Sequence, residues 1–598
     1  MIPPSWVHPI VGGFLLMRGM RVPKRTSRCT HACVGDLSGG NAALEGARVE
    51  RAQSQAGREA WTGATPEDLD VLEAQIGREP RGVMKVAQRC HFGRPQVIVN
   101  APVQIDAEGR ARPFPTLFWL TCPYLVKAVG ALEGAGWIDR MRREFHDGGE
   151  RSAALQRAHE AHARLRMSLC DPEALRRLTP GERRVVEESG VGGTRQPCGI
   201  KCLHAHLADY LGRGAGDGVN VVGRKTAGLL LEQGIDLLGH GDCASCCGPR
   251  GGAGGEPVAA IDAGSNAVRL LVARAKRTRS GRLVGLEVLD AARRTTRLGS
   301  ALAPAGASPG ASGQLAATQA RADAGSRKGP GTGSALSEIA RRATIDALGA
   351  FVERAGAAGA QVIVAGATAA VRESSGAGEF LVEVWERLGI SLRVIPEHEE
   401  ARLAYVGALA ALAGDDAFSE AGAVTVVDVG GGSTETVLGE GAGAIRWRSS
   451  VPIGAVRLTR EFGSEGPAAA RAMYDAARKR LEEAGVPPAG MEVGRVVAVG
   501  GTAAAVAAVT KGLTGYDPGK IRGTRVQAAD LDDLFTRLAS LSPAERAAVP
   551  GLDGERADII LAGVAILKAL VDLLGAGRFT VSDGGVAHGL VWELVRGD

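Results

Sequence analysis

Two stretches of similar sequence decide the fold: AIDAGSNAVR at residues 260–269 and VVDVGGGSTE at residues 426–435. In each, an apolar run typical of a β-strand ends in an aspartate, Asp262 or Asp428, which is followed by glycine and then by hydroxyl or amide side chains. Successive backbone amides in such a turn form a concave site for phosphate oxygens, and the aspartate can hold a metal ion or its water. A single copy is often only a tight turn. Two copies, about 165 residues apart, predict two related domains that face each other across a phosphate.

The surrounding sequence alternates between strands and helices. A third strand and double-glycine turn, VAVGGT, occupies residues 497–502. Strands are predicted at 258–262, 362–365, 424–428, 496–499 and 579–582, and helices at 335–355, 376–388, 399–412, 468–484 and 557–574. This alternation indicates α/β layers, in which ligands bind at the carboxyl ends of the strands.

Composition limits the classes of function. The 598 residues exceed what one hydrophobic core supports, and the content of 45% hydrophobic and 23% charged residues is that of a globular protein. Of the net charge of +5, the first 60 residues contribute +4, so the remainder lacks the basic face of a specific nucleic-acid binder. No apolar run reaches the roughly 18–20 residues that span a bilayer. We therefore expect a cytoplasmic protein with no membrane partner and no specific nucleic-acid partner.

The composition also predicts where the domains begin and end. The expected order is an extension without stable structure at 1–60, a Cys/His-rich domain at 65–247, a Gly-rich linker at 248–256, a first α/β domain at 257–400 with a low-complexity insertion at 303–333, and a second α/β domain at 401–598.

The C-terminal motifs carry a family resemblance. The three glycine-rich turns resemble the phosphate-binding and nucleotide-binding loops of the actin, sugar kinase and heat-shock ATPase superfamily. The order of the motifs from about Val258 to Leu590 resembles the exopolyphosphatase and guanosine pentaphosphate phosphatase family, in a short form of about 340 residues. The motifs are GSN at 264–266, ATAAVRE at 367–373, EEAR at 399–402, GGGSTE at 430–435, PIGAVR at 452–457, YDP at 516–518 and RAD at 556–558. The resemblance implies duplicated actin-like (ribonuclease H-like) domains with a central phosphate cleft, preceded by a small Cys/His-rich α+β domain.

The resemblance also implies a reaction, the hydrolysis of terminal phosphoanhydride bonds. The expected substrates are inorganic polyphosphate and the alarmone guanosine pentaphosphate, and the expected assembly is a homodimer. Glu400 matches the general base of the family, whereas the alternative for a carboxylate at a helix start is a favourable interaction with the helix dipole. Asp428 and Glu435 match residues that bind Mg²⁺ or Mn²⁺ and shape the electrostatics of the site. For Asp428 the alternative is a side chain that caps its own turn.

The remaining residues of the predicted site would bind phosphate. Arg269 and Arg372 are candidate clamps, because a guanidinium can bind two oxygens at once, although each could instead form an ion pair within the protein. The turns would cradle phosphate through Gly264, Ser265, Asn266, Gly430, Gly431, Gly432, Ser433, Thr434, Gly500, Gly501 and Thr502. Three positions depart from the family pattern: Ile395-Pro396-Glu397 before the EEAR motif, Ala267 in the first turn, and Ala587-His588 near the C-terminus.

The N-terminal half contains a dense group of cysteine and histidine. A tetrahedral zinc site needs four ligands, and the candidates are Cys198, Cys202, His204, His206, Cys243 and Cys246. An iron–sulfur cluster and buried, unligated thiols are the alternatives. The stretches RCHFGRP at 89–95 and PFPTLFWLTCP at 113–123 resemble the domain-of-unknown-function family 501. This resemblance does not indicate what the domain does.

Two other functions fit the same motifs. A kinase or ATPase of the actin superfamily would need an adenine pocket and a second-substrate site. A non-catalytic sensor of polyphosphate or alarmone would bind the same ligand without turnover, and the altered turn at Pro396 is the feature that suggests it.

Overall fold

The computed structural model describes residues 61–596 except for 107, 217, 240–254, 302–334, 414–421, 442–443 and 515–516. The predicted extension at 1–60, most of the predicted linker, the low-complexity insertion, and both Cys243 and Cys246 lie outside the described residues. Among the described residues, no helix combines the length and the apolar character needed to cross a membrane.

The N-terminal region is an α+β unit, as predicted. Strands β1 (Val83–Arg89), β2 (Pro95–Asn100) and β5 (Phe118–Leu120) form an antiparallel sheet in the order β1-β2-β5. Strands β3 (Val103–Ile105) and β4 (Ala111–Pro113) form a separate hairpin. The helices are α2 (Pro66–Ile76), α3 (Pro123–Gly134), α4 (Trp137–Phe145), α5 (Glu150–Ser168), α6 (Pro172–Arg176), α7 (Pro180–Glu188), α8 (Leu203–Arg213) and α9 (Val221–Glu232).

The first sheet of the C-terminal region has the order β10-β9-β6-β7-β8. Strand β6 (Val258–Ala263) pairs antiparallel with β7 (Ala267–Arg277), which pairs antiparallel with β8 (Leu283–Thr295). On its other edge β6 runs parallel to β9 (Val362–Ala367), and β9 to β10 (Leu392–Val394). The associated helices are α11 (Glu338–Ala357), α12 (Ala369–Arg372) and α13 (Ala377–Leu388).

The second sheet repeats this arrangement. Its order is β13-β12-β11-β14-β16-β15, in which the first three strands are antiparallel and β11, β14 and β16 are parallel. The strands are β11 (Ala423–Val429), β12 (Thr434–Glu440), β13 (Ala444–Val451), β14 (Arg495–Val499), β15 (Arg525–Gln527) and β16 (Arg578–Val581). The shared strand order shows that the C-terminal region is duplicated, and β15 is an extra antiparallel strand.

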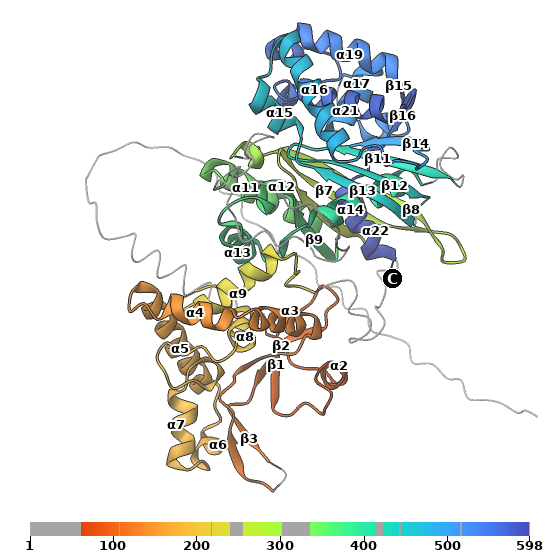
Figure 1. Ribbon diagram of the computed structural model, residues 1–598. Coiled ribbons are helices and arrows are strands. Elements are labelled where there is room, and N and C mark those ends of the chain that lie inside the picture. Colours follow the sequence, from red (N-terminus) through yellow and green to blue (C-terminus); the bar gives the residue numbers. More distant parts are fainter. Residues whose placement is uncertain are drawn as a thin grey trace, which may run out of the picture. The chain divides into compact units, whose positions relative to one another are not determined.

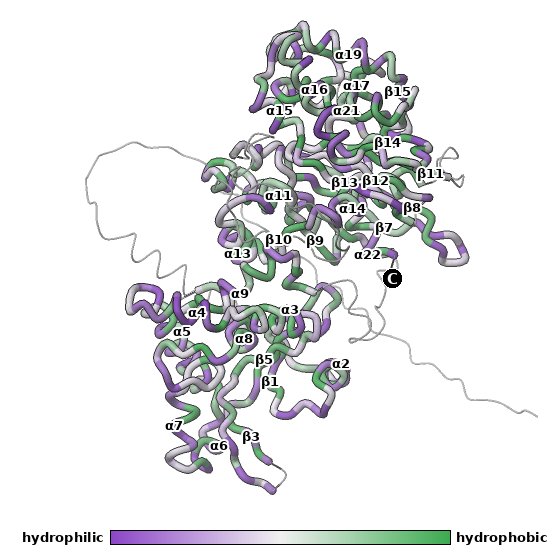
Figure 2. The backbone as a smooth tube through the Cα atoms, in the orientation of Figure 1, coloured by the Kyte–Doolittle hydropathy of each residue, from purple (hydrophilic) through white to green (hydrophobic). Residues whose placement is uncertain are grey.

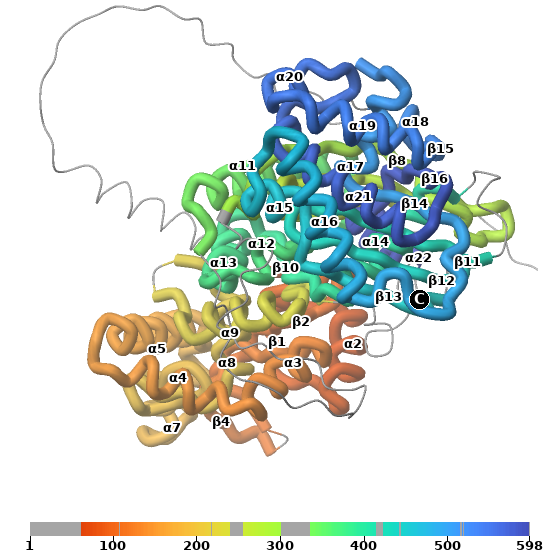
Figure 3. The backbone as a smooth tube through the Cα atoms, turned by 45° about the horizontal axis from the view of Figure 1, so that its top comes forward, coloured from red at the N-terminus to blue at the C-terminus, as the bar shows by residue number. Residues whose placement is uncertain are grey.

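Alternation along the strands assigns each face of the second sheet to different helices. Val424 and Val426 pack in one cluster with α14 (Glu397–Leu412), whereas Val427 and Val429 pack in another with α17 (Gly500–Thr510) and α21 (Ile560–Leu573). Successive side chains of a strand point to opposite faces, so both faces are apolar and covered (Figures 1 and 3). The hydropathy colouring of Figure 2 follows these apolar strands. The other helices of this half are α15 (Ala455–Phe462), α16 (Pro467–Glu483), α18 (Pro518–Ile521), α19 (Ala528–Ser540) and α20 (Pro543–Ala547).

The last helix, α22 (Val586–Arg596), packs on α14 and on strands β6 and β7 of the first sheet. Glycines let the two helices approach closely, because a Cβ at Gly407 would lie 2.1 Å from the carbonyl oxygen of Gly585. Leu590 and Val591 join the cluster that contains Val258. The end of the chain therefore returns to the first sheet, although the sequence places it in the second domain.

Candidate active site

The two Asp-Gly turns meet at one cavity of about 60 Å³. A water needs roughly 10–15 Å³ by this measure, so the space suits about five heavy atoms, on the order of one phosphoryl group. The predicted residues that line it are Gly264, Ser265, Asn266, Arg269, Glu400, Asp428, Gly430, Gly431, Gly432, Ser433, Glu435, Gly501 and Thr502. The structure thus brings together residues that are far apart in the sequence.

Both turns have the same backbone closure. The amide of Gly264 donates to the carbonyl of Ala267 over 3.1 Å, and the amide of Gly430 donates to that of Ser433 over 3.0 Å. The turns approach each other, since a Cβ at Gly431 would lie 3.3 Å from the Cβ of Ser265. The duplication seen in the sheets therefore extends to the two Asp-Gly turns themselves.

The second turn is fixed from behind by the start of α15. The amides of Ala455 and Val456 donate to the carbonyls of Gly430 and Gly431, both over 2.9 Å. A Cβ at Gly454 would lie 2.4 Å from backbone atoms of Gly431, so glycine is required where these two segments cross.

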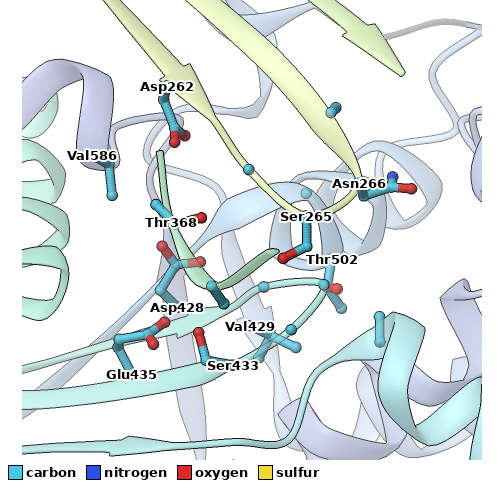
Figure 4. Close-up of a pocket in the computed structure, with 18 of the residues that line it drawn as sticks. Asp262, Ser265, Asn266, Thr368, Asp428, Val429, Ser433, Glu435, Thr502 and Val586 are labelled. Carbon is cyan, nitrogen blue, oxygen red and sulfur yellow. The ribbon is translucent and has the colours of Figure 1, made fainter. Parts of the chain in front are cut away.

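Buried carboxylates gather on one side of the cavity. Figure 4 shows Asp262, Asp428 and Glu435 on this side, with Ser265 and Thr502 opposite and Asn266 pointing away from the carboxylates. Burial raises the pKa of Asp262 to about 6, with Arg269 opposing the rise and Asp428 adding to it. Burial also raises the pKa of Asp428, against the effect of Arg269. The pKa of Glu435 is raised well above its usual range by burial and then by Glu400 and Asp428.

This concentration of negative charge fits a divalent cation. Asp262 Oδ1 is buried without a hydrogen-bond partner, and Arg269 approaches its other oxygen only to 3.6 Å. Within the described ranges, no three His, Cys, Asp or Glu side chains form a ready ligand group. Mg²⁺ is usually held by one or two carboxylates together with waters and substrate phosphates, so the acidic side of the cavity suits a hydrated Mg²⁺ better than a metal enclosed by protein ligands.

Glu400 is held by an arginine. Its Oε2 accepts from Arg372 Nη1 over 2.7 Å, and the same nitrogen donates to the carbonyl of Ile395 over 2.8 Å. Burial raises the pKa of Glu400 to about 7, while Arg372 opposes the rise and Asp262 and Asp428 contribute to it. Arg372 does not line the cavity. It makes the internal ion pair that was the alternative to a phosphate clamp.

Two further predicted residues lie behind the cavity. Thr434 is fully buried on β12, and its hydroxyl donates to the carbonyl of Ile453 over 2.7 Å. Gly500 has a φ of 86° and lies against Asp428, where a Cβ would come within 2.4 Å of Oδ1. Both positions support the turns, and neither lines the cavity.

Sequence reasoning missed several lining residues. The ATAAVRE and RAD motifs contain Thr368 and Arg556, for which the sequence alone indicates no role. Arg556 lies over the nucleotide-type turn, because a Cβ at Gly501 would coincide with its guanidinium. The further lining residues are Ala267, Ala369, Val429, Ala455, Ile559 and Val586. The family motifs were the signal that could have identified Thr368 and Arg556.

The four described candidates for a zinc site are engaged separately. His206 Nδ1 lies 3.0 Å from Asn220 Oδ1, His204 Nδ1 lies 3.2 Å from Glu133, and the thiol of Cys198 donates to the carbonyl of Ser152 over 3.5 Å. Burial raises the pKa of the Cys202 thiol. In this described part they do not converge on a metal, and Cys243 and Cys246 lie outside it.

The C-terminal and N-terminal regions each match a known protein family. The Ppx/GppA phosphatase family matches residues 326–597, and the family named "Protein of unknown function (DUF501)" matches residues 86–227. Exopolyphosphatase 2 of Mycobacterium tuberculosis is 33% identical over 242 residues, which cover 38% of this chain and 73% of that protein. An uncharacterised protein of Streptomyces coelicolor is 30% identical over 246 residues, or 40% of this chain and 70% of that protein.

Among similar solved structures is that of the Aquifex aeolicus Ppx/GppA family member, which is 28% identical to this chain. The alignment covers 56% of this chain and 96% of that chain, with a TM-score of 0.43. An exopolyphosphatase from Cytophaga hutchinsonii is 20% identical and covers 57% of this chain and 98% of that chain with a TM-score of 0.47. From the family match and the shared length of the mycobacterial relative, the chain belongs, through its C-terminal region, to the Ppx/GppA phosphatase family.

Proposed function

We propose that the protein hydrolyses the terminal phosphoanhydride bond of inorganic polyphosphate, and also that of guanosine pentaphosphate, through an actin-like pair of domains. The observation that carries the proposal is the cavity of about 60 Å³ between the turns headed by Asp262 and Asp428, which Glu400 also lines. Family membership supports phosphoanhydride hydrolysis as the reaction class.

The base in this proposal is Glu400. A general base works best when its pKa lies near the operating pH, and burial brings the pKa of Glu400 to about 7. Because Arg372 holds one carboxylate oxygen, the other oxygen is left to accept a proton from the attacking water. Glu400 would therefore activate water at neutral pH, which a carboxylate with an ordinary pKa does poorly.

The turns would bind the phosphoryl group that is attacked. Phosphoryl transfer depends mainly on positioning and on donors directed at the oxygens that carry charge. The amides and hydroxyls around Ser265 and Ser433 supply donors from two sides, and the guanidinium of Arg269 supplies positive charge. Asp428 and Glu435, with Asp262 beside them, would hold Mg²⁺ or Mn²⁺. The bound cation would neutralise charge on the phosphate oxygens.

A substrate panel tests this function. Phosphate release from polyphosphate, guanosine pentaphosphate and ATP is measured with and without Mg²⁺ on one preparation of the full chain. We expect Mg²⁺-dependent release of phosphate from polyphosphate and from guanosine pentaphosphate, since each presents one terminal phosphoryl group to the cavity. A preference for ATP would support the ATPase alternative, and tight polyphosphate binding without release would support the sensor.

A further inference from the structure

The turn that follows helix α9 packs on the strand that leads to the active-site helix. In this turn, residues 233–238, the amide of Leu237 donates to the hydroxyl of Ser391 over 2.9 Å. A Cβ at Gly234 would lie 2.9 Å from the carbonyl oxygen of Val394. Leu237 and Ser391 are both buried, so the N-terminal region covers strand β10 directly.

A row of buried charges continues from this turn toward Glu400. Asp236 Oδ2 lies 3.0 Å from His91 Nε2, and Arg393 of β10 donates to Glu399 over 3.0 and 2.6 Å. Asp236 and Arg393 are 5% and 7% exposed. Burial lowers the pKa of Arg393, but Glu399 and then Asp236 raise it to a net increase. Asp236 precedes Leu237, whose amide holds Ser391 of β10. Arg393 lies two residues further along the same strand and holds Glu399, the carboxylate next to Glu400.

The first turn of α14 depends on such outside support. Its N-cap residue is Pro396, which provides no side-chain hydrogen bond to the helix. The amides of Glu399 and Glu400 both donate to the carbonyl of Pro396, over 3.0 and 2.8 Å. An uncapped helix start frays readily, so contacts to the preceding strand and to Glu399 decide how firmly this turn is held.

We propose that Asp236 and Arg393 are positioning residues: acting through Glu399, they fix the first turn of α14 and thereby the carboxylate of Glu400. The N-terminal region then serves the hydrolase as an internal support of its general base. The effect on catalysis, which we call the catalytic part of this inference, rests on the function proposed above. The effect on the stability of the first turn of α14, which we call the mechanical part, does not.

The opposite end of the same interface supplies a matched control. Arg224 of α9 donates to Glu379 over 2.6 Å and to Glu386 over 2.9 Å, and Glu232 accepts from the amide of Gly378 over 2.6 Å. These contacts hold helix α13 and do not involve β10 or α14. Arg224→Gln therefore weakens the interface without touching the proposed support.

Hydrogen exchange of the full chain tests the mechanical part without reference to activity. In Asp236→Asn, and more strongly in Arg393→Met, we expect the amides of residues 397–403 to exchange faster by ~10-fold or more. In Arg224→Gln, faster exchange should be confined to α13. Unchanged exchange at 397–403 in a folded Asp236→Asn protein overturns the proposal, as does equal acceleration of that segment by Arg224→Gln.

Kinetics of the same proteins test the catalytic part. We expect Asp236→Asn to lower kcat by roughly 5- to 20-fold with KM changed less than about two-fold, because the base is displaced while phosphate binding is retained. Arg224→Gln should leave kcat within about two-fold. If the wild type releases no phosphate, the proposed function fails and the exchange data still decide the support. If the wild type is active and Asp236→Asn matches it, the inference fails alone.

Discussion

At the scale of single residues, the proposed function makes the pair of Arg372 and Glu400 responsible for the pH dependence of activity. Arg372 lowers the pKa of Glu400 from the value that burial alone would impose. Arg372→Gln should raise that pKa, so the acid limb of kcat/KM should move to higher pH. A pH profile from 5 to 9 measures the shift. If Arg372 instead clamps phosphate, KM would rise and the acid limb would stay in place.

Asp262 should lower the stability of the ligand-free protein. Its pKa is about 6 in the folded protein, against an ordinary value of 3.8, so between these pH values the folded state holds the proton more tightly. The free energy of unfolding should therefore fall as pH rises from about 4 to about 6, by up to ~3 kcal/mol at 1.36 kcal/mol per pH unit.

Asp262→Asn removes this penalty. We expect its unfolding midpoint to exceed that of the wild type at pH 8 and to approach it near pH 4, in thermal scans without metal. Added Mg²⁺ should stabilise the wild type more than the variant. A variant less stable than the wild type at pH 8 would show that the carboxylate is compensated in the apo protein.

At the scale of elements, the contact between α14 and α22 depends on glycine. A methyl group at Gly407 would collide with the backbone of Gly585, and overpacking a core typically costs about 1–3 kcal/mol. Gly407→Ala should lower the free energy of unfolding by at least this much in urea titrations. Gly356→Ala is the control, because it lies in α11 with nothing within 4 Å and should gain up to ~1 kcal/mol. Equal effects of the two substitutions would contradict the packing.

Most of these elements could be predicted from local sequence. The helix expected at 376–388 is α13 at Ala377–Leu388, and the strand expected at 424–428 is β11 at Ala423–Val429. Periodicity and flanking glycines act locally, so such segments can be recognised without a fold. The return of α22 to the first sheet could not be predicted, because an apolar helix face does not by itself indicate which of the two sheets it will cover.

The site itself was predictable only in part. Residues on the two turns, such as Ser265 and Ser433, were found because each turn carries its own pattern. Arg556 was missed because it reaches the cavity through tertiary packing over Gly501. For Arg372 the sequence leaves a phosphate clamp and an ion pair open, because it does not show that the side chain reaches Glu400.

At the scale of the whole molecule, duplication explains the site. The same strand order occurs in both sheets, so Asp262 and Asp428 end equivalent strands, and the two turns close on one cavity. Each Asp faces the outgoing strand in register, Asp262 opposite Arg269 and Asp428 opposite Glu435. The two halves therefore differ in charge, because the strand leaving the first turn carries Arg269 and the strand leaving the second carries Glu435.

The central claim is that Glu400 acts as the general base that activates water for attack on a terminal phosphate bound between the two turns. Phosphate release from polyphosphate in ¹⁸O-labelled water tests it, with Glu400→Gln compared with Glu353→Gln, an exposed carboxylate on α11. We predict one ¹⁸O in each released phosphate, a loss of at least ~100-fold in kcat for Glu400→Gln, and a change below about two-fold for Glu353→Gln. Phosphate release by Glu400→Gln at the rate of the wild type would contradict the account.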